Sequence, residues 1–343
     1  MRKDVNPYYN GPASDHFDGV RFFLPNHNAS NCTSDLIKWQ TSGERQAWPK
    51  WVENRPQQAP AHRVDDLSAT FIGHATVLLQ VSGLNILTDP FLSSRTSPFQ
   101  FAGPKRVRHP GIVLEDLPPI DVILVSHNHY DHMDLPALRK LHDLHGSRII
   151  TPLGNAAIIN KARRPFSITE SDWGDKVSLP RDIDVTLTPA MHWSKRTPFD
   201  RNMALWGAFV IETPAGPVYF AADTGYGSGQ HFRDVRAQFG EPRLALLPIG
   251  AYEPRWFMSG QHMNPEEAVR GHNDLGAHRS LAIHHSTVQL TDEAIDQPVI
   301  DHAEAMERQG VAEDRFRVLE TGESWAVPPL ATAGDAVLEQ AAE

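Results

Sequence analysis

From Ala69 onward, the apolar positions of this chain gather into short runs separated by glycine, proline and polar residues. Apolar runs of this length, bounded by turn formers, indicate buried strands rather than helices. The predicted strands include Thr76–Val81, Leu84–Thr88, Asp121–Ser126, Ile183–Thr188, Trp206–Glu212, Val218–Ala222, Leu244–Ile249 and Leu281–His284.

Helical segments are predicted between some of these strands, at Leu135–Leu144, His231–Phe239, Pro265–Leu275 and Val299–Gln309. The third has a clear start, with Asn264 as N-cap, Pro265 at the first position and Glu267 at the third. The fourth stops at Gly310, a residue that commonly ends helices. Many strands with interspersed helices predict an α/β (α+β) fold in stacked layers, with the helices outside and the sheets inside.

The pattern divides the chain into three parts. Residues 1–65 are rich in aromatic residues and turn formers, and we expect an extension packed on the main domain with little regular structure. Residues 66–328 form the predicted main domain. Residues 329–343 are rich in alanine and glutamate and are expected to be a loose tail.

Composition and charge exclude several classes of protein. The net charge is −10, from 32 Lys and Arg against 42 Asp and Glu, which argues against nucleic-acid coating because that depends on clustered cations. A single cysteine excludes a disulfide framework. No secretory signal and no run of the ~18–20 apolar residues that span a bilayer are visible. We therefore expect a soluble cytoplasmic protein whose membrane contact, at the inner surface, would be peripheral.

The candidate chemistry begins where the predicted strand Asp121–Ser126 ends, in the run His127-Asn-His-Tyr-Asp-His132. Histidines two apart at a strand end point to the same side, so His127 and His129 can bind one ion together. Asp131 and His132 follow a turn and can face a second ion. Zinc, iron and manganese all accept this combination of imidazole and carboxylate ligands.

One loop cannot supply all ligands of two ions, and three further candidates follow other predicted strands: His192, Asp223 and His284. A carboxylate bridges two ions more readily than an imidazole does. We therefore assign one site to His127, His129, His192 and Asp223. The second site receives Asp131, His132, Asp223 and His284.

Several neighbouring residues stay open at this stage. His285 competes with His284, which lies nearer the strand end. Asp89 ends the strand Leu84–Thr88 and suits the carboxylate that accepts the other ring N–H of a metal-bound histidine; the alternative is a simple turn aspartate before proline. His74 either orients a ligand or satisfies backbone groups. We interpret His16, His62, His272 and His302 as surface residues.

Two other groups of residues have both a functional and a structural interpretation. Lys105, Arg106 and Arg108 are a basic cluster that would suit anionic head groups or simply a solvated loop. A set of apolar residues would form a mouth for acyl chains or ordinary core: Phe91, Phe99, Phe101, Trp256, Phe257 and Met258.

The run His127–His132 resembles the metallo-β-lactamase superfamily signature His-x-His-x-Asp-His. Further blocks resemble one branch, the N-acyl-phosphatidylethanolamine-hydrolysing phospholipases D: Phe71-Ile-Gly-His-Ala-Thr76, Leu87-Thr-Asp-Pro90, Gly103-Pro-Lys-Arg106, Ala222-Asp-Thr-Gly-Tyr226 and Pro248-Ile-Gly-Ala-Tyr-Glu-Pro-Arg-Trp-Phe-Met258. The resemblance covers residues 69 to 325. It implies a four-layer αβ/βα sandwich, two zinc ions held by the seven ligands named above, a homodimer, and cleavage of a phospholipid phosphodiester.

The resemblance also places Tyr130, Gln261 and His262 at the substrate end of the site. It further favours His284 over His285. One position departs from the family, because Leu135 stands where an aromatic residue contacts lipid. The acyl-chain pocket of this chain is therefore expected to differ from that of the family.

The mechanism expected for such a site is attack of metal-bound hydroxide on phosphorus, with Asp131 orienting the hydroxide. The products would be N-acylethanolamine and phosphatidic acid. Two other readings fit the sequence: a different hydrolase on the same scaffold, such as a lactonase or sugar-phosphate enzyme, and a metal-binding sensor without turnover.

Overall fold

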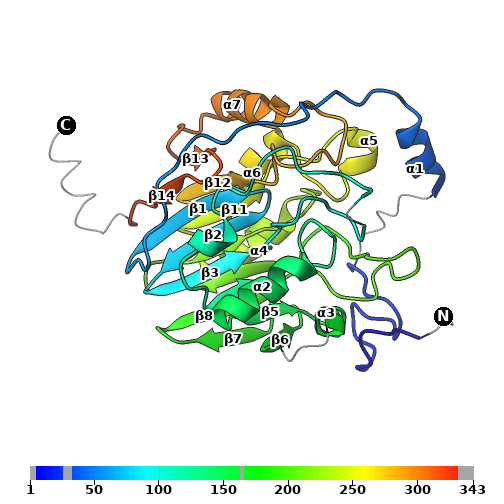
Figure 1. Ribbon diagram of the computed structural model, residues 1–343, viewed down its shortest axis with the longest axis horizontal. Coiled ribbons are helices and arrows are strands. Elements are labelled where there is room, and N and C mark those ends of the chain that lie inside the picture. Colours follow the sequence, from blue (N-terminus) through cyan, green and yellow to red (C-terminus); the bar gives the residue numbers. More distant parts are fainter. Residues whose placement is uncertain (1–4, 26–32, 100, 163–165, 331–343) are drawn as a thin grey trace.

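Two β-sheets lie face to face in the computed structural model, with helices on their outer sides (Figure 1). The structure describes residues 5–25, 33–99, 101–162 and 166–330. The first sheet has the strand order β14-β1-β2-β3-β4-β5-β6, and the second has the order β13-β12-β11-β10-β9-β8-β7. This arrangement confirms the predicted fold class, a four-layer sandwich of the metallo-β-lactamase type.

Along the chain, runs of consecutive strands (β1 to β3 and β6 to β10) are separated by segments that contain the helices. The strands of the first sheet are β1 (Leu67–Gly73), β2 (Thr76–Val81), β3 (Leu84–Thr88), β4 (Val122–Leu124), β5 (Arg148–Pro152), β6 (Ile168–Ser171) and β14 (Ser324–Ala326). Those of the second sheet are β7 (Lys176–Leu179), β8 (Ile183–Thr188), β9 (Ala208–Glu212), β10 (Val218–Phe220), β11 (Leu244–Pro248), β12 (Arg279–Ile283) and β13 (Phe316–Arg317). The α-helices are α1 (Thr33–Gln40), α2 (Leu135–His145), α3 (Asn155–Ile159), α4 (Gln230–Phe239), α5 (Arg255–Met258), α6 (Pro265–Leu275) and α7 (Gln297–Gln309).

Alternate residues of the first sheet serve two separate cores. Val77 and Leu79 of β2 point into the core between the sheets, whereas Leu78 points to the core beneath the outer helices. Ile123 of β4 likewise joins Leu138 of α2 in that second core. Both faces of these strands are therefore buried, which explains why a strand such as β4 is a continuous apolar run without polar alternation.

The predicted helix signals work as expected. Asn264 and Glu267 form a capping box at the start of α6, and Gly310 ends α7 in the left-handed conformation. Helix α6 packs against β11 and lies between α4 and α7, so these helices cover the second sheet. None of the described helices is long and apolar enough to cross a membrane.

The structure adds local detail to these expectations. Residues 1–65 contain one described helix, α1, that was not among the predicted helices. Strand β1 was not named among the predicted strands; it contains Ser68 and Thr70, and pairing with β2 and β14 buries it fully. The apolar run Asp121–Ser126 forms a strand only over Val122–Leu124, because the following residues turn into the site.

Three histidines interpreted as surface residues are buried. His16 contacts Asp15 and Asp172, and stacks on Trp173. His272 Nδ1 shares a hydrogen bond with Ser280 Oγ at 2.8 Å, and His302 packs edge-on against Phe316. Each imidazole buries most of its ring against an aromatic or polar neighbour, which a one-dimensional pattern does not reveal.

The N-terminal extension is anchored to the rest of the chain by described contacts. Phe17 and Phe22 are buried in the larger hydrophobic core, and Asn6 donates to the Met203 carbonyl at 2.8 Å. The predicted boundary near residue 65 stays a prediction. Within the tail 329–343, residues 331–343 lie outside the described part of the chain.

Candidate metal centre

One edge of the paired sheets collects the chemistry-bearing residues. Strands β1, β3 and β4 point the same way in the first sheet, and β8, β10 and β12 do so in the second. Their carboxyl ends open onto the same rim, where parallel strands commonly place ligands. The residues that follow these ends are His74, Asp89, the run His127–His132, His192, Asp223 and His284.

The backbone at this rim is strained in several places. His74, Asp89, Ala222 and His284 all have positive φ, between 30° and 63°, although none is glycine. Such conformations cost free energy and persist only where the surrounding structure holds them. Their concentration here marks the rim as a functional site.

Four side chains form the first group, as the sequence predicts. His127 Nε2 lies 2.8 Å from His129 Nδ1, and His192 Nε2 lies 3.3 Å from the same atom. Asp223 Oδ2 approaches His192 Nε2 to 3.6 Å. One ligand atom from each of these four residues lies within 4.8 Å of the others, a spacing that one ion can span.

A second group lies beside the first. Asp131, His132 and His284 converge with His74 within the same 4.8 Å limit. Asp223 extends to this group as well, since its Oδ1 is 3.2 Å from His284 Nε2 and its Oδ2 is 3.1 Å from His132 Nε2. Asp223 therefore faces both groups, which is the geometry that a bridging carboxylate requires. Metal binding by the seven residues stays a prediction.

Two further residues hold the predicted ligands in place. Asp89 Oδ2 accepts a hydrogen bond from His132 Nδ1 at 2.6 Å, and both its oxygens also bind Ser126. His74 Nε2 lies 2.8 Å from Asp131 Oδ2. The contact with Asp89 leaves His132 Nε2 free to face an ion, the arrangement that orients ligands in metalloproteins. His74 thus orients a candidate ligand, the first of the two roles considered from the sequence.

Burial sets the charge of the first group. It lowers the pKa of His129 to about 3 and that of His192 to about 4, so both imidazoles are neutral near pH 7. Neutral imidazole is the form that binds metal ions. At His132, burial acts in the same direction, but Asp223, Asp131 and Asp89 outweigh it and raise the pKa well above its usual value.

The donor atoms fit a pair of cations. His132 Nε2, His284 Nε2 and Asp223 Oδ1 are all buried without a hydrogen-bond partner among the described residues. Unpartnered buried polar atoms are costly and need an explanation. Divalent ions ligated by imidazole and carboxylate supply one.

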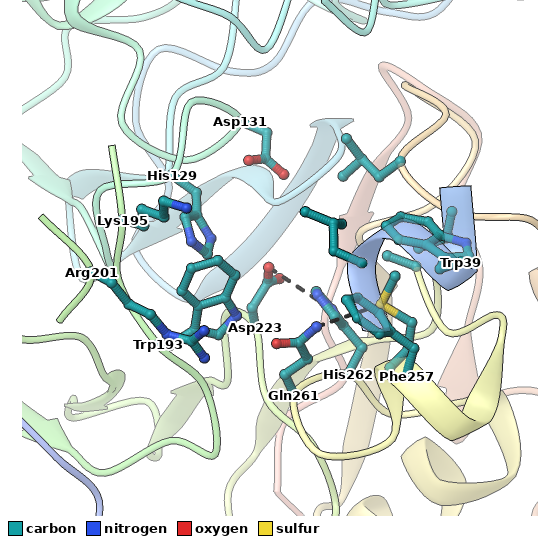
Figure 2. A pocket seen from close by; sticks show the side chains of 15 residues that line it. Trp39, His129, Asp131, Trp193, Lys195, Arg201, Asp223, Phe257, Gln261 and His262 are labelled. Carbon is teal, nitrogen blue, oxygen red and sulfur yellow. Dashed lines mark hydrogen bonds and ion pairs between the residues drawn. The ribbon is translucent and has the colours of Figure 1, made fainter. Parts of the chain in front are cut away.

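A cavity of about 310 Å³ opens directly above these ligands. His129, Asp131 and Asp223 line its floor, together with Gln261 and His262 (Figure 2). One wall carries Trp193, Lys195 and Arg201. Across from it lie Trp39 and Phe257 (Figure 2), and the apolar residues Leu36, Met258 and Leu290 also line the cavity.

The predicted substrate residues do not all lie on this cavity. Gln261 and His262 line it, and the Gln261 carbonyl also contacts His192 Nδ1 at 3.0 Å. Tyr130 is not among the lining residues; its hydroxyl donates to the Arg196 carbonyl at 3.0 Å, and its ring packs beneath the Arg196 guanidinium. Substrate contact by Tyr130 stays a prediction, and its observed contacts brace the ligand loop.

The remaining open choices are resolved by position. His284 points into the second group, whereas His285 stacks on Phe71 with ring centroids 5.1 Å apart. Phe257 and Met258 line the cavity, but Phe91 is buried core packed against His74. Phe99, Phe101 and Trp256 are exposed.

Sequence reasoning missed several cavity residues. Helix α1 supplies Leu36 and Trp39, and Trp39 is held by a hydrogen bond from Nε1 to Asp292 Oδ2 and by stacking on Phe257. No sequence signal connects residue 39 to residues 257 and 292. Lys195 offered a weak signal, because it lies three residues after the predicted ligand His192.

Comparisons with known proteins show the family to which the chain belongs. A profile described as the beta-lactamase superfamily domain matches residues 84–285. The N-acyl-phosphatidylethanolamine-hydrolyzing phospholipase D 1 of Caenorhabditis elegans is 36% identical over 77% of this chain and 77% of its own length. The mitochondrial protein of that name from Saccharomyces cerevisiae is 31% identical over 79% of this chain, which spans 57% of the yeast protein.

Solved structures support the fold at low sequence identity. Igni18, a metallo hydrolase from Ignicoccus hospitalis, superposes with a TM-score of 0.56 at 20% identity, over 76% of this chain and 97% of its own. An isothiocyanate hydrolase from Delia radicum gut bacteria superposes with a TM-score of 0.58 at 20% identity, over 76% of this chain and 98% of its own. By fold and by sequence, the chain belongs to the beta-lactamase superfamily of metal-dependent hydrolases, in the family of N-acyl-phosphatidylethanolamine-hydrolysing phospholipases D.

Proposed function

We propose that this chain is a dinuclear-metal phosphodiesterase of phospholipase D type. Its substrate would be N-acyl-phosphatidylethanolamine. Water adds across the bond between phosphorus and the ethanolamine oxygen: the hydroxyl joins phosphorus to give phosphatidic acid, and the proton joins the oxygen to give N-acylethanolamine. The identity of the relatives from worm and yeast supports this substrate class.

The observation that carries the proposal is the composition of the cavity. Candidate metal ligands form its floor, two cations lie on one wall, and apolar side chains lie on the other. A phosphodiester joined to a long acyl chain has matching parts: an anion between two oxygen substituents, and an apolar tail. A small neutral lactone would leave the cations unmatched.

The two metal groups would hold zinc, and the same ligand set accepts iron and manganese. Bound divalent ions supply Lewis acidity, which lowers the pKa of water and polarises phosphoryl oxygens. The chain would hold one ion through His127, His129, His192 and Asp223. Asp131, His132, His284 and the shared Asp223 would hold the other.

The side chains of the cavity would position the phosphate. Lys195 has no ion-pair partner among the described residues, so its ammonium is available to a phosphate oxygen. The Gln261 amide contacts only the weakly accepting sulfur of Met258, at 3.6 Å, and can turn to donate to the substrate. His262 Nδ1 lies 4.0 Å from Asp223 Oδ2, on the floor of the cavity.

The apolar wall would hold the acyl chain. Trp39 is fixed by its bond to Asp292 and its stacking on Phe257, so this wall is preformed. A preformed apolar surface binds a flexible chain at a lower entropic cost than one that must be ordered.

The direct test is incubation of the purified, metal-loaded protein with N-acyl-phosphatidylethanolamine. Mass spectrometry should find phosphatidic acid and N-acylethanolamine in equal amounts, and a run in ¹⁸O-water should place the label on the phosphate. Homoserine lactones and a sugar phosphate serve as competing substrates. Faster turnover of either, or metal binding without any turnover, would contradict the proposal.

A further inference from the structure

Three loops of the candidate metal centre meet at one threonine, Thr224. Each loop carries side chains of the site, either candidate ligands or residues of the cavity floor. They are the histidine loop with His192 (190–192), the aspartate loop with Asp223 (223–225) and the cavity loop with Gln261 and His262 (259–263). Figure 2 shows Asp223 beside Gln261 and His262, although these side chains come from separate loops.

The Thr224 hydroxyl joins the histidine loop to the aspartate loop. The side chain is fully buried, and its Oγ1 accepts a hydrogen bond from Met191 N at 3.0 Å. The same hydroxyl donates to the Gly225 carbonyl at 2.9 Å. A backbone bond from Gly225 N to the Met191 carbonyl, 2.9 Å long, ties the same two loops. Met191 immediately precedes His192, and Thr224 immediately follows Asp223, so these bonds link the backbone beside two candidate ligands of the first group.

A third partner completes the hydrogen bonds of this hydroxyl. His231 Nε2, at the start of helix α4, lies 3.3 Å from Thr224 Oγ1. Burial lowers the pKa of His231 to about 4, so the ring is neutral near pH 7 and carries one N–H. With that hydrogen on Nε2, the hydroxyl accepts two hydrogen bonds and donates one, which uses its full capacity. A hydroxyl held by three partners is fixed in one orientation.

The cavity loop packs against the same point. Met263 N donates to the Thr224 carbonyl at 2.9 Å, and the Gln261 carbonyl contacts His192 Nδ1 at 3.0 Å. At Gly225, an added Cβ atom would lie 2.9–3.0 Å from backbone atoms of the cavity loop, so a larger residue would force the two backbones apart. Because the three loops are in such close contact, a displacement of Thr224 would move the cavity floor as well as the ligands.

We propose that Thr224 is a positioning residue of the metal centre, whose hydroxyl fixes His192 and Asp223 relative to each other. This role rests on the metal groups of the proposed function, but not on which bond the chain hydrolyses. Ligands from two separate strand ends share one ion only if their loops keep a fixed spacing. The first group takes two of its four ligands from the two joined loops, so its ion should depend on Thr224 more than the other ion does.

The test compares the zinc affinity of variants of the full chain by competitive titration against a chromophoric chelator. Thr224→Val removes the hydroxyl and keeps the shape of the side chain, whereas Thr224→Ser keeps the hydroxyl and removes only a methyl group. Thr213→Val is the matched control. Thr213 Oγ1 likewise accepts from a backbone N–H, of Ala215, and donates to a backbone carbonyl, of Gly216. Its turn joins β9 to β10 at the end of β10 opposite to Asp223.

We expect Thr224→Val to bind one of its two ions about 10- to 30-fold more weakly, because the Met191 N–H loses its acceptor and the histidine loop shifts. Thr224→Ser should stay within about three-fold of the wild type, and Thr213→Val within about two-fold. A second readout is the visible absorption spectrum of the cobalt-loaded chain, which reports the geometry of the ligands around the ion. This spectrum should change in Thr224→Val and stay the same in Thr224→Ser and Thr213→Val.

Thermal unfolding verifies that each variant folds, and Thr224→Ala, which also lacks the hydroxyl, replaces Thr224→Val if the latter does not fold. A zinc affinity and a cobalt spectrum that match those of Thr213→Val would overturn the positioning role. Equal losses in Thr224→Ser and Thr224→Val would overturn it as well, because they would assign the effect to the methyl group.

The outcome for the wild type separates this role from the proposed function. A wild type that binds no metal would overturn both. A wild type that binds two ions but hydrolyses no phospholipid would contradict the proposed function alone, since both readouts measure the metal centre itself.

Discussion

Replacing Asp89 by asparagine changes one buried oxygen to an amide nitrogen and almost nothing else. In the structure, Asp89 Oδ1 accepts from Ser126 N at 2.7 Å, and Oδ2 accepts from Ser126 Oγ at 2.5 Å and from His132 Nδ1 at 2.6 Å. Asparagine preserves the first contact. Its NH2 group then faces the ring N–H of His132, so two donors meet.

The proton of His132 must then move from Nδ1 to Nε2, the nitrogen that faces Asp223 and Asp131. An Nε2–H cannot ligate a metal ion. Restoring the ligating tautomer forfeits a charge-assisted hydrogen bond of about 1.5–3 kcal/mol. This corresponds to a 10- to 100-fold weaker affinity at the site that contains His132, in line with the general effect of removing such a carboxylate.

The measurement is competitive titration of zinc against a chromophoric chelator, with metal content per chain determined by mass spectrometry. Asp200→Asn is the matched control: Asp200 is 2% exposed and accepts from Arg196 N, Thr197 N and the Tyr8 hydroxyl, but it touches no candidate ligand. The control should keep wild-type affinity. If Asp89→Asn retained two tightly bound ions with an affinity within three-fold of wild type, Asp89 would not orient His132 as described.

Further outcomes follow from the same contacts. Asp223→Ala should lower turnover by more than about 100-fold and reduce the bound metal, since Asp223 faces both groups; near-normal turnover would refute bridging. Lys195→Met should raise KM about ten-fold for an anionic phosphodiester and leave a neutral ester unchanged, an effect that added salt should shrink; equal effects on both substrates would show a packing role. Burial lowers the pKa of His302 from 6.5 to about 4, so its stabilising contribution is present above pH 6.5 and is lost as pH falls toward 4, by up to about 3 kcal/mol. Denaturant titrations should therefore show that the free energy of unfolding of His302→Gln falls less steeply than that of the wild type between pH 6.5 and pH 4. The same pH dependence in both proteins would contradict the burial of His302 in its neutral form.

The sequence itself determined the ligand loop and its place in the fold. His127, His129, Asp131 and His132 are adjacent along the chain and follow an apolar strand, so local geometry alone brings them to one rim. His192, Asp223 and His284 were inferred because each follows a predicted strand, and parallel strands open at one edge. The cap of α6 and the end of α7 are equally local, and both were predicted residue for residue.

Tertiary structure decided what surrounds that rim. The partner of His74 is Asp131, fifty-seven positions away, and the wall formed by Trp39 depends on Asp292 and Phe257. Burial of His16, His272 and His302 likewise depends on neighbours from remote segments. Local patterns fix which residues end a strand, because strand geometry is set by nearby sequence. They do not fix which side chains meet across the molecule, because those contacts form only when the two sheets and the N-terminal extension pack together.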